Sequence, residues 1–252
     1  MKKKLCAAML ALLVACPSFH AQNLLNETPE QKDKRMEWFH KAKLGIFIHW
    51  GIYAVKGVSE SWSFYNKYLP HDEYLKQCEG FTASKYDPKA WVELIKESGA
   101  QYTVLTTKHH DGVALWDTKQ NGISVVKNTP AKRDLVTPFV NEVRKAGLRL
   151  GLYYSLPDWS HPDYPNMTRT DVRYKDDPKR WDNFCKFNFG QLAELNNTYK
   201  PDLYWFDGDW EMSAETWRAK EIMQLLRSNN KNVIVNSRIT GYGDYATPEQ
   251  GV

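Results

Sequence analysis

Residues 87–111 read DPKAWVELIKESGAQYTVLTTKHHD, and this order of residue types is typical of one repeat of an α/β fold. Asp87 suits a helix N-cap and Pro88 suits the first helical turn, so the stretch that follows predicts a helix. Gly99 favours the end of that helix. Gln101–Thr106 is a short, mostly apolar run, which predicts a buried strand. The strand then leads directly into a cluster of charged residues and histidines.

The same order recurs along the chain. Helices are predicted over 29–43, 87–98, 134–146, 181–199 and 214–228, and strands over 44–51, 101–106, 148–153, 202–206 and 232–236. Alternation of helix and strand predicts an α/β fold with a parallel sheet. Each predicted strand ends in a polar or aromatic cluster, as in a (β/α)8 TIM barrel, where the C-terminal strand ends carry the chemistry. No glycine-rich nucleotide-binding motif follows the first strand, which disfavours a dinucleotide-binding sheet.

Five predicted strands are fewer than the eight that close a barrel. Either three strands escape the pattern, or the sequence is a piece of a larger protein, and we favour the second interpretation. We therefore expect residues 22–252 to form a (β/α)8-type catalytic domain that lacks its last strands. Such an open barrel would be weakly stable or weakly active.

Composition excludes several classes of protein. The chain has 252 residues, of which 42% are hydrophobic and 25% charged, so it is not a disordered protein. A mean hydropathy of −0.62 excludes a polytopic membrane protein. Ten Trp and fourteen Tyr are typical of chains that bind ligands with flat apolar faces. The net charge of +4 falls to about +1 without Lys2, Lys3 and Lys4, and the remaining charges are mixed, so no nucleic-acid partner is expected.

The first 21 residues are typical of an export signal. Lys2–Lys4 form a basic start, and Leu5–Ala15 form an apolar run that is too short to span a bilayer, so we expect no integral membrane span. Cleavage after Ala21 would give a periplasmic or secreted protein. Alternatively, the residues before Cys16 resemble a lipoprotein leader (1–15), with acylation of Cys16 and anchoring at the cell surface. The remaining alternative is that this segment is a buried helix of the fold.

Only Cys78 and Cys185 remain outside that leader, and they are far apart in the sequence. Their spacing predicts neither a zinc site nor a disulfide scaffold, although one disulfide is compatible with an oxidising compartment.

The strand-end clusters supply the candidate functional residues, which are His49, His109, His110, Asp207 and Arg238. Carboxylates, imidazoles and nearby indoles suit glycoside cleavage, because carboxylates act as nucleophiles and proton carriers. Each residue has a second interpretation: His49 could be a core histidine, and Asp207 could belong to a plain turn or to a calcium site with Asp209 and Glu211. The two adjacent histidines could form a metal pair. On a continuous strand they would point to opposite faces, so this needs a turn of the backbone.

Several longer segments are similar to those of the α-L-fucosidases of glycoside hydrolase family 29. They are KLGIFIHWG (43–51), SESW (59–62), KYDPKAWVELIKESGAQYTVLTTKHHDGVALWDT (85–118), GLYYS (151–155) and PDLYWFDGDW (201–210). These segments occur in the family's order within residues 37–250, which is nearly all of the chain outside the leader.

This resemblance implies a retaining exo-α-L-fucosidase with a (β/α)8-like domain, followed in the family by a β-sandwich that this sequence lacks. It implies Asp207 as the nucleophile and Glu249, in the segment GDYATPEQ, as the acid/base. The residues implied to contact the sugar are His49, Glu60, Trp62, His109, His110, Tyr153 (from the pair with Tyr154), Trp205 and Arg238. The implied substrate is a fucosylated oligosaccharide or glycoprotein glycan, and no cofactor or metal is expected. Two alternatives remain open: an inactive fucose-binding remnant, and a metal-dependent hydrolase using His49, His109 and His110.

Overall fold

The computed structural model describes residues 27–248, and its centre is a parallel sheet of five strands. The strands are β1 (Gly45–Ile48), β2 (Tyr102–Lys108), β3 (Arg149–Ser155), β4 (Leu203–Asp207) and β5 (Ile234–Val235). Each strand pairs with the next one in the chain, in the order β1-β2-β3-β4-β5. A doubly wound sheet reverses its strand order at a switch point, whereas a barrel does not. The predicted α/β class is confirmed, and the five strands form part of a TIM-barrel-like sheet.

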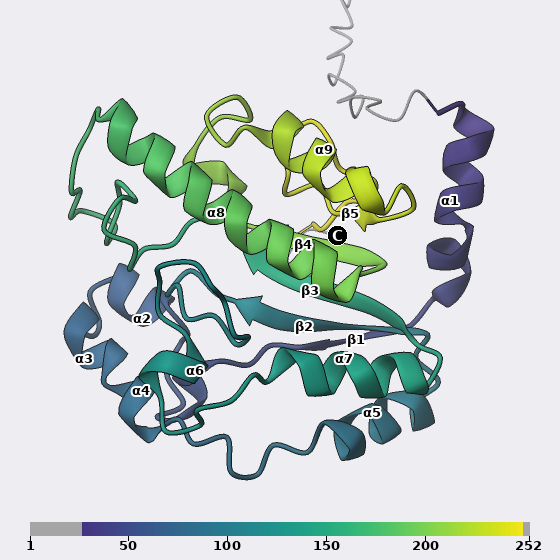
Figure 1. Ribbon diagram of the computed structural model, residues 1–252, viewed down its shortest axis with the longest axis horizontal. Helices are drawn as coiled ribbons and strands as arrows, with labels where there is room; N and C mark the ends of the chain where they lie inside the picture. The colour runs from purple at the N-terminus through teal and green to yellow at the C-terminus, as the bar shows by residue number, and fades with distance from the viewer. Residues whose placement is uncertain (1–26, 249–252) are drawn as a thin grey trace, which may run out of the picture.

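Helices of two kinds surround this sheet (Figure 1). The long ones are α1 (Pro29–Ala42), α5 (Pro88–Glu97), α7 (Val136–Lys145), α8 (Pro178–Tyr199) and α9 (Ala219–Asn229). The short ones are η1 (Ile52–Ala54), α2 (Trp62–Tyr65), α3 (His71–Leu75), α4 (Gln77–Gly80), α6 (Val125–Asn128) and η2 (Asp209–Glu211). Figure 1 shows α2–α4 beside the C-terminal ends of the strands and α1 at the opposite end, where the strands begin.

Capping residues set where the helices begin. The Asp87 side chain accepts a hydrogen bond from the backbone N–H of Ala90 at 3.0 Å, as the sequence predicts. Asp177 caps α8 in the same way, so this helix begins at Pro178, three residues before the predicted start. The predicted start of α9 at residue 214 is wrong, because Arg218 adopts a left-handed conformation with φ of 55° and the helix begins after it.

The strand bounds differ from the predictions for local reasons. β1 ends at Ile48 rather than at residue 51, because the chain turns into η1 directly after Gly51. β2 and β3 are longer than predicted, since their pairing continues to Lys108 and Tyr154. β5 is limited to Ile234 and Val235.

The two faces of the sheet pack against different partners. Alternate residues such as Leu152, Tyr154 and Phe206 belong to the large core that also contains the buried faces of α5, α7, α8 and α9. The other set, which includes Tyr153 and Leu203, forms a second cluster with Met36 of α1. We call the face that carries this second set the inner face. Side chains alternate along a strand, so Trp205 and Asp207 lie on the inner face as well.

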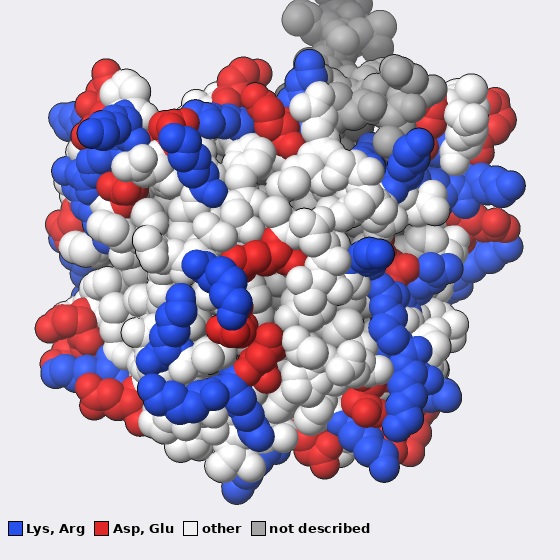
Figure 2. Space-filling view, in the orientation of Figure 1, with Lys and Arg blue, Asp and Glu red and all other residues white. Residues whose placement is uncertain are grey.

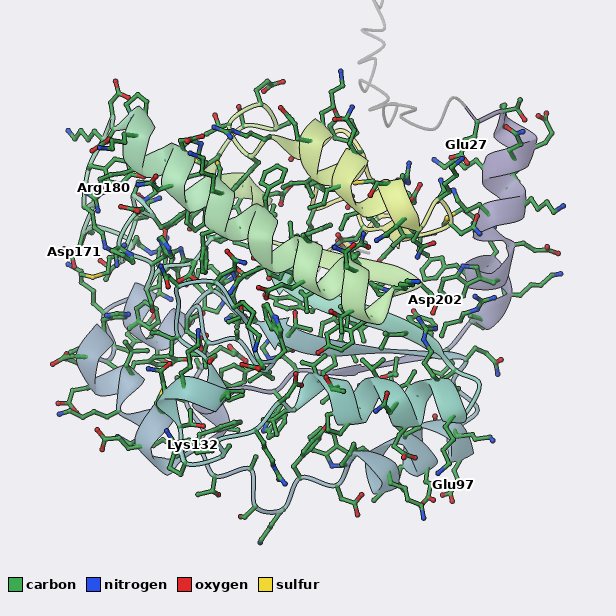
Figure 3. The ribbon with its side chains drawn as sticks, in the orientation of Figure 1. Glu27, Glu97, Lys132, Asp171, Arg180 and Asp202 are labelled. Atoms are coloured by element: carbon green, nitrogen blue, oxygen red, sulfur yellow. The ribbon has the colours of Figure 1, made fainter. Side chains whose placement is uncertain are left out.

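A buried ion cluster attaches α1 to the C-terminal part of the described chain. Arg35 of α1 donates hydrogen bonds to Glu27 at 2.6 Å and to Asp244 at 2.8 Å. Arg227 donates to the same Asp244 carboxylate at 2.9 Å, and so does the backbone N–H of Val235 at 3.0 Å. The side chains of Arg35 and Asp244 are 4% and 3% exposed. Figure 3 labels Glu27, where this cluster meets the start of α1.

Cys78 and Cys185 are buried free thiols, so the structure contains no disulfide between them. Burial raises the pKa of the Cys78 thiol to about 12, which makes it a poor nucleophile at neutral pH. Within residues 27–248, no helix combines the length and the apolar composition needed to cross a membrane. Lys and Arg side chains alternate with Asp and Glu side chains on the face shown in Figure 2.

Candidate active site

Asp207 is the last residue of β4 and lies opposite Ser155, the last residue of β3. Its carboxylate is surrounded by donors. The Tyr153 hydroxyl donates to Oδ2 at 2.8 Å, the Arg238 guanidinium donates to Oδ1, and the Gly208 backbone N–H donates to Oδ1 at 3.1 Å. The residue is 8% exposed. Three donors therefore hold both oxygens of this carboxylate in place.

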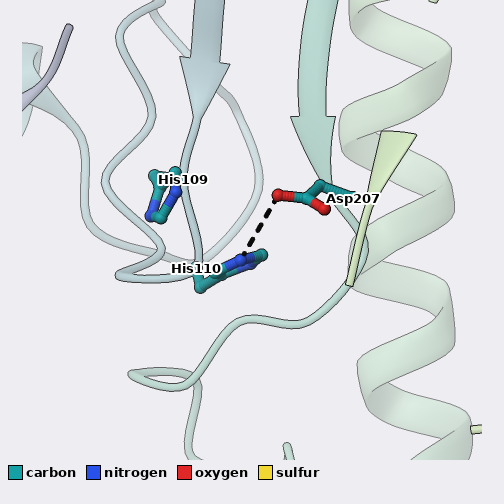
Figure 4. Close-up of side chains that lie close together, drawn as sticks. All are labelled: His109, His110 and Asp207. Atoms are coloured by element: carbon teal, nitrogen blue, oxygen red, sulfur yellow. Dashed lines mark ion pairs between the residues drawn. The ribbon is translucent and has the colours of Figure 1, made fainter. Parts of the chain in front are cut away.

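Two histidines face this carboxylate (Figure 4). β2 ends at Lys108, and the backbone then turns, with Gly112 at φ of +79°. The ring centroids of His109 and His110 therefore lie 4.3 Å apart rather than on opposite faces of a strand. The Nε2 atom of His110 is 3.5 Å from Asp207 Oδ2. The sequence left open whether the backbone turns at the two histidines, and the structure shows that it does.

Serine hydroxyls contact the far nitrogens of both histidine rings. His109 Nδ1 lies 2.6 Å from the Ser61 hydroxyl oxygen, and His110 Nδ1 lies 2.6 Å from that of Ser155. These contacts fix the orientation of both rings. The two serines come from different elements, because Ser61 precedes α2 and Ser155 ends β3.

Burial keeps both rings neutral. Burial lowers the pKa of His110 to about 3, and the charges of His49, Lys108 and Arg238 act in the same direction. Burial likewise lowers the pKa of His109 well below its usual value. The negative charge of Asp207 acts in the opposite direction on the pKa of His109, but burial has the larger effect. Arg238 forms an ion pair with this carboxylate. A neutral imidazole has one nitrogen that donates and one that accepts.

Lowering the pH from 7 to 5 should destabilise the fold through His110. Its pKa rises from about 3 in the folded state to 6.5 in the unfolded state, so the unfolded state binds the extra proton. Stability is therefore lost as the pH falls below about 6.5, by roughly 2 kcal/mol at pH 5 for this one residue. Urea denaturation of the wild type and of His110→Asn at both pH values measures the difference. The same pH dependence in both proteins would contradict the expectation.

His109, His110 and Asp207 could in principle bind a metal ion, since one potential ligand atom from each lies within 4.8 Å of the others. However, Asp207 already accepts hydrogen bonds from Tyr153 and Arg238, and an adjacent guanidinium opposes the binding of a second cation. The Asp207 oxygens are therefore already occupied by donors of the protein, which disfavours their use as metal ligands.

The calcium alternative is not supported by the contacts. Asp209 accepts from the Thr240 hydroxyl at 2.8 Å, and Glu211 accepts from Trp159 at 2.7 Å. Asp207, Asp209 and Glu211 thus contact three different sets of partners rather than one common point.

His49 and Glu60 form the edge of the site. His49 follows β1, and its Nδ1 is 2.9 Å from the Tyr53 hydroxyl and 3.8 Å from Glu60 Oε1. Both side chains are 36% exposed, which contradicts the interpretation of His49 as a core histidine. Glu60 has a φ of 33°, which is strained for a residue with a side chain. Strain of this kind is common at functional sites.

Aromatic rings surround the carboxylate on two sides. On the inner face, the centroid of Phe47 lies 5.2 Å from that of Trp205 and 5.9 Å from that of Tyr153. On the other side, the centroid of Trp62 lies 5.6 Å from that of His110 and 6.3 Å from that of Trp210. Trp210 is 53% exposed. The site is therefore a polar centre between two aromatic walls.

The structure brings together nine of the ten predicted site residues. They are His49, Glu60, Trp62, His109, His110, Tyr153, Trp205, Asp207 and Arg238. Tyr154 points to the opposite face, where its hydroxyl contacts Asn188 and Lys108, whereas the Tyr153 hydroxyl contacts Asp207. The tenth residue, Glu249, lies outside the described residues.

Sequence reasoning missed the residues that hold the histidines and extend the aromatic walls. These are Phe47, Tyr53, Ser61, Ser155, Trp159 and Trp210. For Phe47 and Ser155 the available signal was their position at the C-terminal end of a strand, which marks residues near the mouth of a barrel. The other four lie in the segments that follow β1, β3 and β4.

Comparison with known proteins gives concordant results. The family model described as Alpha-L-fucosidase matches residues 12–252. The tissue alpha-L-fucosidase of Macaca fascicularis is 34% identical over 259 residues, which cover 91% of this chain and 53% of that protein. The chain spans about half the length of the curated relatives it matches.

Solved structures with the same arrangement include alpha-L-fucosidase isoenzyme 1 from Paenibacillus thiaminolyticus. It has a TM-score of 0.81 and 36% identity, and the match covers 88% of this chain and 56% of that one. A second is a GH29 alpha-L-fucosidase from Bacteroides thetaiotaomicron, with a TM-score of 0.75 and 32% identity, covering 91% and 54%. That structure is a trapped covalent intermediate obtained with 2-fluoro-fucosyl fluoride.

Proposed function

The chain belongs to the alpha-L-fucosidase family of glycoside hydrolases, and we propose that it is an exo-acting, retaining α-L-fucosidase with Asp207 as its nucleophile. The observation that carries the proposal is the position of this carboxylate. It ends a barrel-type strand, it is almost completely buried, and donors hold both of its oxygens. The proposed substrate is a fucosylated oligosaccharide or a glycoprotein glycan with terminal α-L-fucose.

In the first step, an Asp207 oxygen forms a bond to the anomeric carbon while the bond from that carbon to the glycosidic oxygen breaks. A carboxylic acid gives its proton to the departing oxygen, and we propose Glu249 for this role. In the second step, the same group, now a carboxylate, takes a proton from water as the water oxygen replaces Asp207. Two displacements at one carbon retain its configuration.

Support for Glu249 comes from the described residues just before it. The Thr247 hydroxyl accepts from Arg238 Nε at 3.2 Å, and the same guanidinium donates to Asp207. The chain therefore reaches the site two residues before Glu249. In a retaining enzyme the two carboxyl groups are about 5–5.5 Å apart.

The other site residues are proposed to bind the sugar. His49, Glu60, His109, His110 and Arg238 present polar atoms, which suit the hydroxyl groups of the sugar. Trp62 and Trp205 present apolar ring faces. Fucose is a deoxy sugar with a methyl group, and this group can pack against such a face.

Hydrolysis of 4-nitrophenyl α-L-fucoside by the purified chain tests the proposal, with proton NMR to identify the first anomer released. We expect α-L-fucose as the first product, and no loss of rate in the presence of a chelator. Release of the β-anomer would contradict the retaining mechanism. Inactivation by the chelator would favour a metal-dependent hydrolase, and a fucose-dependent rise in Tm without product would favour a binding protein.

We also propose that the protein is exported. The basic and apolar pattern of residues 1–21 supports this, although that segment lies outside the described residues. Mass spectrometry of the N-terminus of the mature protein distinguishes cleavage after Ala21 from acylation at Cys16.

A further inference from the structure

The Ser155 hydroxyl has one hydrogen and two close neighbours. Its oxygen lies 2.5 Å from the Pro157 carbonyl oxygen and 2.6 Å from His110 Nδ1. A carbonyl oxygen can only accept, so the short contact to Pro157 requires the hydroxyl hydrogen to lie between the two oxygens. Were the hydrogen directed at the histidine instead, two oxygen lone pairs would face each other at 2.5 Å.

The position of this hydrogen determines which nitrogen of His110 carries the ring proton. Since the Ser155 hydrogen is used by Pro157, the contact between Ser155 and His110 must be a hydrogen bond donated by Nδ1. The ring is buried and neutral, so Nε2 then has no proton and can only accept. The hydrogen bond at one ring nitrogen thus sets the chemistry of the other.

Nε2 of His110 is one of the buried side-chain atoms without a hydrogen-bond partner among residues 27–248. Its nearest charged neighbour is Asp207 Oδ2 at 3.5 Å, which is itself an acceptor (Figure 4). Two acceptors therefore face each other across a gap. A buried polar atom without a partner is costly, and a hydroxyl group that lies beside this pair and directs its hydrogen at Nε2 would satisfy it.

We propose that Ser155 is a positioning residue: it keeps the His110 proton on Nδ1, so that Nε2 accepts the hydrogen of a substrate hydroxyl beside Asp207. The inference rests on the proposed function, in which Asp207 attacks the anomeric carbon. That carbon has two ring neighbours, the ring oxygen and C2, and of these only C2 carries a hydroxyl. The hydroxyl within reach of both Asp207 and Nε2 is therefore the one on C2, where hydrogen bonds strengthen in the transition state.

Nitrogen NMR of the protein labelled with ¹⁵N in histidine measures the tautomer without any turnover. In the wild type, His110 should show a protonated Nδ1 and an unprotonated Nε2. In Ser155→Ala the proton should move to Nε2 in part of the population, whereas Ser155→Thr keeps a hydroxyl and should retain the wild-type signal.

Kinetics then test the contact with substrate. Ser155→Ala should lower kcat/KM for an α-L-fucoside about tenfold or more, and by a clearly smaller factor for the matching 2-deoxy-fucoside. Ser155→Thr should recover most of the loss. Thr107→Val is the matched control, because the Thr107 hydroxyl is also buried and donates to a carbonyl, that of Tyr153, at 2.6 Å. This control should change both substrates equally.

A wild-type spectrum with the proton on Nε2 would overturn the inference. Equal losses of kcat/KM for both substrates in Ser155→Ala would overturn it too. Because the spectrum is recorded without substrate, a failure of the inference is distinguishable from a failure of the proposed function.

Discussion

An Asp207→Asn variant should fold normally and hydrolyse α-L-fucosides at least about a thousandfold more slowly than the wild type. The amide has nearly the same shape as the carboxylate: its oxygen can accept from Arg238 and the Gly208 N–H while its NH2 group donates to the Tyr153 hydroxyl, so the packing is kept. It cannot form the ester with the anomeric carbon at a useful rate, and it removes the charge that Arg238 balances. Single-turnover and steady-state measurements with 4-nitrophenyl α-L-fucoside check the expectation.

Two further measurements make this result specific. Asp207→Gly leaves space on the face of attack, so azide should restore turnover and give a fucosyl azide of β configuration. Asp209→Asn is the matched control, since Asp209 lies two residues away and accepts from Thr240. This variant should lower the rate of hydrolysis less than about tenfold. Wild-type turnover in Asp207→Asn, or a 2-fluoro-fucosyl label on another peptide, would show that the nucleophile is assigned wrongly.

An Asp244→Ala variant should lose about 3–5 kcal/mol of unfolding free energy. The Asp244 carboxylate is the shared partner of Arg35 and Arg227, whose side chains are 4% and 7% exposed. Removing it leaves Arg35 and Arg227 with Glu27 as the one remaining carboxylate of the cluster, so one buried positive charge is unbalanced, and it also removes the acceptor of the Val235 N–H. Urea denaturation followed by tryptophan fluorescence measures the loss.

The control is Glu37→Ala, which removes an ion pair with Lys41 on the same α1 helix. Those side chains are 56% and 74% exposed, so the unfolding free energy should hardly change. If Asp244→Ala behaved like this control, the buried cluster would not contribute to stability as we infer.

The repeating part of the fold was predictable because it depends on local signals. Asp87 at a helix start and Gly99 at its end mark boundaries that neighbouring residues suffice to fix. The short helices α2–α4 were not predictable in this way. They have four or five residues each, and each places one side chain in the core: Phe64 from α2, Tyr74 from α3 and Cys78 from α4. Isolated helices of this length are not stable.

The site was predictable to the level of its residues but not of its contacts. The position of Asp207 at a strand end, and the resemblance of its segment, identified the central carboxylate. The closeness of His109 to His110 depends on a backbone turn that the sequence does not specify. The serines that hold them are 48 and 45 residues away in the chain, so only the folded structure brings them to the rings.

The pairing of Arg35 with Asp244 also has a consequence for how the protein is made. These residues are 209 positions apart, so helix α1 leaves the ribosome long before its partner is synthesised. Closing so long a loop is slow, and the contact cannot form on a partial chain. The nascent protein should therefore remain sensitive to proteases until Asp244 has emerged, and the attachment of α1 should add resistance only from that point on.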